Sequence, residues 1–134
     1  MTRDTEHYAK VTKENRAMNE ILEKALLYDF YGELLTTHQK DIYEQYILED
    51  LSLSEIATNQ GVSRQGVHDL VRRCEKILEG YENKLHLVEK FLSIRNHVSE
   101  MEDLFARYDK EDGSNVEELI KSVRKLSGEI LEKL

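Results

Sequence analysis

The sequence predicts an all-α protein, and three observations lead to that prediction. The chain has no proline and only six glycines in 134 residues, so few residues interrupt a helix. Apolar residues recur at intervals of three and four, the period of a helix with one buried face. Polar residues suited to capping a helix stand before several of these stretches. A chain of this length fits one domain with an appended helical arm.

The first helix is expected over residues 17–35, where apolar side chains follow helical spacing. Residues 1–16 show no steady period, so we expect a loose or frayed extension there. They also lack the apolar stretch of a secretory signal. Aromatic residues at helical spacing are expected to build the core of the first helices: Tyr28, Phe30, Tyr31, Tyr43 and Tyr46.

Two shorter helices with capping signals follow. Thr36 lies three residues before Gln39, which is the spacing of a capping box, and this predicts a second helix that ends near residues 49–50. Ser52 and Glu55 repeat the same spacing and predict a third, short helix.

Residues 54–77 have the pattern of a helix-turn-helix. Two helices that cross closely need a small residue on the first and a permissive backbone at the turn, and Ala57 and Gly61 supply them. Ser63 is then placed to cap the fourth helix. Four apolar residues are expected to lock the two helices together: Ile56, Val62, Val67 and Leu70.

The fourth helix divides into an apolar face and a polar face when residues are placed about 100° apart. The apolar face contains Val67, Leu70, Val71, Cys74, Ile77 and Leu78. The polar face supplies the candidate nucleic-acid-binding residues, together with the capping serine: Ser63, Arg64, Gln65, His68, Arg72 and Arg73. Asp69 and Glu75 are expected on the same face and reduce its positive charge.

These residue types suit the reading of nucleic acid. Arginine pairs with guanine and glutamine with adenine, while a serine and the amides of a helix N-terminus suit a phosphate. Arg72 and Arg73 lie further along the helix, where contacts to the backbone of the nucleic acid are more usual. The residues leave an alternative open, a helical hairpin that serves only a protein contact.

Residues 81–134 are expected to form a helical arm. One apolar stripe runs over residues 81–108 and another over 116–134, with a loop between them. The fourth helix either continues into the first stripe or bends at Gly80. The stripes either pack on each other as a hairpin or form a subunit interface, and we expect a homodimer. The chain thus has three predicted parts: the extension 1–16, the helix-turn-helix domain 17–80 and the arm 81–134.

Composition restricts the function further. The net charge is −8, and only residues 51–80 lack an acidic excess, so a nucleic acid should bind there alone and weaken quickly with salt. The five histidines have no metal-ligand spacing, and no catalytic group, cofactor or metal is predicted, so we expect no enzyme. The single cysteine, Cys74, suits the cytoplasm, and no stretch approaches the roughly 20 apolar residues that span a bilayer.

Several short motifs resemble the YlxM family of small helix-turn-helix proteins of Gram-positive bacteria. The shared features are FY-x-x-LLT from residue 30, LEDLSLSEIA from 48, GVSRQ-x-V-x-D from 61 and EKILE-x-YE from 75. The resemblance is good over residues 20–108 and looser in the last helix. This chain departs from the family in having Gly66 where alanine is usual, His68 where tyrosine is usual, and a longer N-terminal extension.

The resemblance implies a fold like that of sigma-factor region 4 and a DNA-binding protein that regulates transcription. It also implies a role in the signal recognition particle pathway, because genes of the family typically lie beside the gene for Ffh, the GTPase of that particle. The alternative is an adaptor that docks on Ffh or on the particle RNA without reading a DNA sequence.

Overall fold

The structure is a computed structural model that describes residues 19–110 and 115–134. All regular elements of these residues are helical, as the sequence predicts. The chain divides into two compact units, Met1–Leu85 and His86–Leu134. The predicted extension over residues 1–16 and residues 111–114 of the predicted loop 109–115 lie outside the described residues, and residues 109 and 110 are helical.

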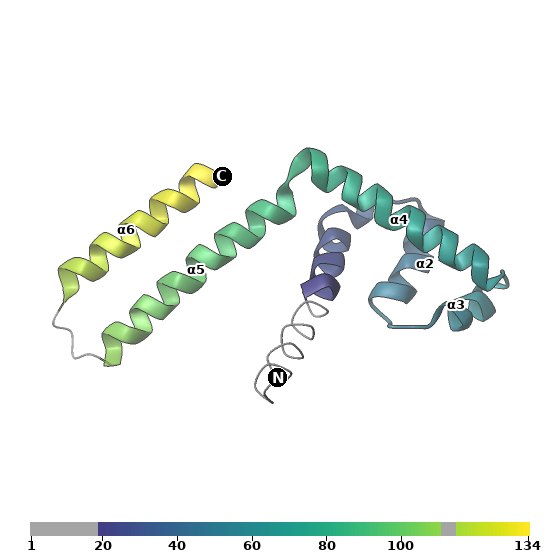
Figure 1. Ribbon diagram of the computed structural model, residues 1–134, viewed down its shortest axis with the longest axis horizontal. Coiled ribbons are helices and arrows are strands. Elements are labelled where there is room, and N and C mark those ends of the chain that lie inside the picture. Colours follow the sequence, from purple (N-terminus) through teal and green to yellow (C-terminus); the bar gives the residue numbers. More distant parts are fainter. Residues whose placement is uncertain (1–18, 111–114) are drawn as a thin grey trace, which may run out of the picture. The chain divides into compact units, whose positions relative to one another are not determined.

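The first unit places three helical segments against one long helix. Residues 19–31 are helical and lead into the short 3₁₀ helix η1 (Gly32–Leu34). The helices α2 (Thr37–Ile47), α3 (Leu53–Gln60) and α4 (Arg64–Leu85) follow (Figure 1). Both α2 and α3 pack on α4, so α4 is the element that the smaller helices share.

The predicted helix over residues 17–35 ends earlier than expected. Its α-helical part stops at residue 31, and the amide of Leu35 bonds to the carbonyl of Gly32 at 3.1 Å, the shorter bond of a 3₁₀ turn. The reason lies in the next helix. Thr36 caps α2 with an extended backbone at ψ 159°, and an α-helix cannot continue into that conformation.

The capping signals are confirmed. The amide of Gln39 donates to Thr36 Oγ1 at 3.2 Å, and the amide of Thr36 donates to Gln39 Oε1 at 3.0 Å, which completes a capping box. At α3 the amide of Glu55 donates to Ser52 Oγ at 3.1 Å. These bonds fix the start of each helix and therefore its direction of entry into the fold.

A cluster of tyrosines joins the first helix to α2 and α4. The rings of Tyr28 and Tyr43 lie 5.7 Å apart, and those of Tyr31 and Tyr81 are stacked at 6.0 Å. Each buried ring on the first helix has a carboxylate partner, because Tyr28 donates to Glu44 and Tyr31 donates to Glu82. Burial, and then the hydrogen bond to Glu44, raises the pKa of Tyr28 far above its usual value, so its hydroxyl stays a donor.

Not every predicted aromatic core residue is buried. Tyr28, Tyr31 and Tyr43 are buried and Tyr46 is half-buried, but Phe30 is 38% exposed. The expectation of a buried Phe30 is wrong, because two residues along a helix turn a side chain by about 200°. Phe30 therefore lies at the margin of the tyrosine cluster, where its ring stands 6.3 Å from that of Tyr31 and is partly open to solvent.

The second unit is a helical hairpin. Helix α5 (Leu87–Lys110) and helix α6 (Val116–Lys133) pack along each other over their length (Figure 1). Between them His97 Nε2 lies 2.9 Å from Glu129 Oε2, and Lys133 Nζ donates to Ser93 Oγ. Both contacts fix the register of the two helices.

Helix α4 neither continues without interruption nor breaks at Gly80, the two alternatives that the sequence offered. Gly80 lies inside α4, which continues to Leu85, and the interruption is at His86. The backbone of His86 has a φ of 56°, a left-handed conformation that ends one helix before the next begins. A glycine was expected to interrupt the helix, but the left-handed residue is a histidine.

The close packing of Gly32 makes a testable prediction. A Cβ at Gly32 would lie 2.8 Å from Cε2 of Tyr28, whose ring cannot retreat because its hydroxyl is bonded to Glu44. We expect Gly32→Ala to lower the free energy of unfolding by about 1–3 kcal/mol. The matched control is Gly80→Ala, where nothing lies within 4 Å and about 0.5–1 kcal/mol should be gained. Urea unfolding of both variants measures the difference, and equal stabilities would contradict the tight contact.

Candidate nucleic-acid interface

The turn between α3 and α4 is built on Gly61. Its backbone has φ 66° and ψ 31°, the left-handed conformation that glycine adopts without a Cβ clash. The amide of Gly61 bonds to the carbonyl of Thr58 at 3.4 Å, and the amide of Val62 bonds to that of Ala57 at 3.1 Å. This pair of bonds is the Schellman motif that closes a helix C-terminus. The predicted role of Gly61 is therefore confirmed.

The two helices are locked by fewer residues than expected. Ile56 and Val67 are completely buried, Ala57 is buried, and Leu70 is partly buried. Val62 is 47% exposed, so its predicted place in the lock is wrong. The backbone amide of Val62 closes the turn by its bond to Ala57, while the side chain of Val62 lies on the outer, solvent side of the turn.

Ser63 starts α4. Its Oγ accepts a hydrogen bond from the amide of Gly66 at 3.0 Å, and its carbonyl accepts from the amide of Val67 at 3.1 Å. A Cβ at Gly66 would lie 3.0 Å from the same Oγ, so the glycine leaves room for the cap. The first amides of the helix, those of Arg64 and Gln65, point out of its N-terminus by helix geometry.

The inward face of α4 is apolar, as predicted. Four of its residues are buried: Val67, Val71, Cys74 and Leu78. Burial raises the pKa of the Cys74 thiol to about 11, so the thiol stays neutral and is no nucleophile at ordinary pH. This row of side chains holds α4 on the rest of the unit and leaves its other face toward the solvent.

The outward face of α4 carries the predicted binding residues. A shallow hollow on this face is lined by His68, Asp69, Arg72, Arg73 and Lys76. The structure thus brings His68, Arg72 and Arg73 together. The other three predicted residues, Ser63, Arg64 and Gln65, are exposed at the N-terminal end of the same helix.

The candidate residues chosen from the sequence did not include Lys76, which also lines the hollow. It lies four residues after Arg72, and residues at that interval share a helix face. That spacing could have identified it, because both side chains are long and positively charged. With Lys76 the hollow has three fixed positive charges.

The two acidic residues assigned to this face behave differently. Asp69 lies on it, where its Oδ1 accepts from Gln65 Nε2 at 2.9 Å and stands 3.5 Å from His68 Nδ1. Glu75 is largely buried and lies 3.4 Å from Lys24 Nζ on the first helix. The prediction that Glu75 weakens the polar face is therefore wrong, and Asp69 is the acidic residue that the hollow contains.

Two observations concern other kinds of site. In residues 19–110 and 115–134 no three His, Cys, Asp or Glu side chains are grouped so that they could hold a metal ion. Within the same ranges, no helix combines the length and the apolar character that crossing a bilayer would require.

Comparison with known proteins identifies relatives of the chain. The sequence model of one family, described as "Putative helix-turn-helix protein, YlxM / p13 like", matches residues 18–123. A UPF0122 protein of Symbiobacterium thermophilum is 44% identical over 92 residues, which cover 69% of this chain and 86% of that protein. One of Lactiplantibacillus plantarum is 45% identical over 100 residues, covering 75% and 84%. One of Bacillus pumilus is 44% identical over 100 residues, covering 75% and 89%.

The cap of α4 makes a second testable prediction. We expect Ser63→Ala to lower the free energy of unfolding by about 1 kcal/mol, because the amide of Gly66 loses its acceptor. Ser63→Asp should retain most of the stability, since a carboxylate also accepts at that position. Thermal unfolding followed by circular dichroism measures both variants. If alanine and aspartate behave alike, the side chain of residue 63 does not cap the helix.

Proposed function

This chain belongs to the UPF0122 family of YlxM / p13-like proteins, and we propose that it is a regulatory protein that binds DNA through the outward face of α4. One observation carries the proposal. The inward face of α4 is buried, while the outward face exposes arginines from its first residue to the hollow around Arg72 and Arg73. A helix held in this way by a tight turn is what a helix-turn-helix inserts into the major groove.

The order of residues along α4 suits such a contact. Arg64 and Gln65 stand at the N-terminal end, where a recognition helix meets the edges of bases. Ser63 and the first amides suit a phosphate. Arg72, Arg73 and Lys76 follow one or more turns later and suit the sugar–phosphate backbone. His68 lies between these two groups.

The acidic remainder of the chain limits binding to this face. A net charge of −8 repels a polyanion at long range, so the cations of α4 must supply the attraction locally. For about three phosphate contacts, the affinity should fall on the order of tens of fold between about 50 and 200 mM salt. We place the protein in the cytoplasm, where a single thiol such as Cys74 stays reduced.

The regulatory part of the proposal rests on the resemblance to proteins like sigma-factor region 4. It includes a role in the signal recognition particle pathway and contact with Ffh. A second candidate is an adaptor that docks on Ffh or on the particle RNA without reading DNA. The position of Asp69 favours this candidate, because a carboxylate within the hollow opposes phosphate and suits a protein partner or a structured RNA.

The main test removes two cations from the outward face. We expect the double variant Arg64→Ala, Arg72→Ala to bind duplex DNA about 10- to 100-fold more weakly, because it loses one base contact and one phosphate contact. Fluorescence anisotropy with labelled duplex DNA, and separately with the particle RNA, measures the affinity over a series of salt concentrations. The matched control is Lys121→Ala, Arg124→Ala on α6, which changes the net charge equally.

The outcomes separate the candidates. Loss of DNA binding in the α4 variant alone supports the proposal. Binding of the particle RNA or of purified Ffh without binding of DNA favours the adaptor. If wild type binds neither nucleic acid at physiological salt, or both double variants bind like wild type, the proposed role of α4 is wrong.

Asp69 gives an independent prediction. We expect Asp69→Asn to strengthen DNA binding about 3- to 10-fold, because it removes a negative charge beside Arg72 and Arg73 while the amide oxygen still accepts from Gln65. Asp103→Asn on α5 has the same net charge and should leave the affinity within about twofold. The same anisotropy titration measures both. A weaker Asp69→Asn variant would mean that Asp69 itself contacts the nucleic acid, as a carboxylate can with cytosine.

A further inference from the structure

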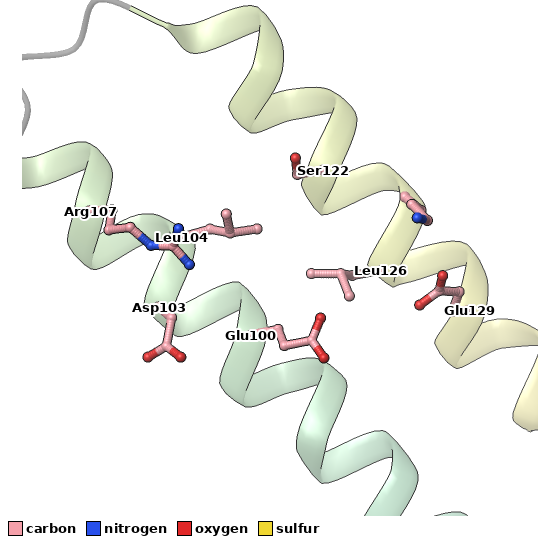
Figure 2. Close-up of a pocket in the computed structure, with 8 residues that line it drawn as sticks. Glu100, Asp103, Leu104, Arg107, Ser122, Leu126 and Glu129 are labelled. Atoms are coloured by element: carbon pink, nitrogen blue, oxygen red, sulfur yellow. The ribbon is translucent and has the colours of Figure 1, made fainter.

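The α5–α6 hairpin has one polar face. A groove on this face is lined mainly by polar and charged residues, among them Asp103 and Lys125. Figure 2 shows Leu104 and Leu126 directed toward each other between the helices, with Glu100 and Arg107 on one side and Ser122 and Glu129 on the other. Charged side chains thus dominate this side of the hairpin.

The opposite side of both helices is apolar. On α5 a stripe at alternate intervals of four and three residues contains Ile94, Val98, Met101, Phe105 and Tyr108. On α6 the same intervals select Val116, Ile120, Val123, Ser127, Ile130 and Leu134. With about 100° per residue, each stripe lies on the side of its helix that is turned away from the groove. Because the helices are antiparallel neighbours, the two stripes form one continuous face, which we call the apolar face.

Much of the apolar face is open to solvent in the single chain. Six large side chains on it, including the adjacent Leu131, are between 44% and 83% exposed: Val98, Phe105, Val116, Ile120, Leu131 and Leu134. Large side chains expose on the order of 150–200 Å² each when uncovered, so these six present on the order of 500 Å². Their half-buried neighbours add to this area, which approaches the roughly 800 Å² per partner of a stable protein interface.

The interior of the hairpin is correspondingly thin. Among the described residues of α6, only Leu126 is buried. Two helices cannot enclose a core between them, because each must bury a whole stripe against other elements. Two such hairpins can do so as a four-helix bundle, whose core is formed by residues at these heptad intervals.

The chemistry of the apolar face points to a second copy of this chain. The borders carry both signs of charge, with Arg95 and Glu102 on α5 and Arg124 on α6, so the same face of a second copy meets no uniform like charge. A nucleic acid would require a cluster of cations, which the stripes lack. The N-terminal residues 1–16 are mostly polar or charged and offer no apolar stripe to cover this one.

We propose that the apolar face of the α5–α6 hairpin pairs with the same face of a second chain and forms a four-helix bundle. The heptad spacing, the exposed apolar area and the mixed border charges all fit this one occupant. The contact lies outside α4, so it does not depend on nucleic-acid binding.

The test places lysines on the apolar face of the full-length protein. Wild type should sediment at twice the mass of one chain at micromolar concentration. The double variant Val98→Lys, Phe105→Lys should raise the dissociation constant of the dimer about 100-fold or more, because both charges would be buried in the bundle. The matched control is Ser99→Lys, Ala106→Lys, which adds the same charges one residue further on, turned about 100° from the apolar face.

Circular dichroism checks that each variant is folded. If the α5 variant is not, Ile120→Lys with Leu131→Lys on α6 makes the same test at positions that are at least as exposed. A monomeric wild type at micromolar concentration overturns the proposal. A dimer that persists equally in the lysine variants also overturns it, because the interface then lies on another surface.

Discussion

The burial of one face of α4 is the constraint on which the rest of the first unit depends. The side chains of Val67, Val71, Cys74 and Leu78 form a continuous row, and each contributes about 2 kcal/mol by leaving water. Helices α2 and α3 pack on α4, and neither is long enough to be stable by itself. The same row fixes which residues of α4 remain outside, so packing decides the composition of the candidate nucleic-acid interface.

Hydrogen bonds at the helix ends define the direction of α4, which apolar packing alone does not fix. The Schellman bonds around Gly61 and the cap at Ser63 set the angle at which α4 leaves the turn. Hydrophobic burial has no direction of its own, and a row of valines alone would tolerate several crossing angles. A base contact of the kind proposed requires placement of a side chain to within a fraction of an ångström, so the polar bonds of the turn would matter to it as much as the apolar row.

Charge gives the two units different surfaces for association. In this member of the YlxM / p13-like family, the outward face of α4 is a local exception in a chain of net charge −8. In the proposed function, its attraction for a polyanion would be short-ranged and further reduced by Asp69. The apolar face of the hairpin depends on area and is almost insensitive to salt. Under the two proposals, affinity for nucleic acid and self-association would respond to different conditions, because one depends on charge and the other on apolar area.

The sequence by itself determined the all-α class, the helix starts at Thr36 and Ser52, the glycine turn and the two faces of α4, because capping and periodicity act within a few residues. The sequence predicted fewer of the features that depend on contacts between segments far apart in the chain. The contact with Lys24, on the first helix, holds Glu75 away from the polar face of α4. Which sides of α5 and α6 stay uncovered depended on the packing of these two helices on each other. Capping and periodicity are properties of a single helix and can be read from its sequence. The exposure of a helix face depends on which other elements pack against it, and only the tertiary structure decides which elements these are.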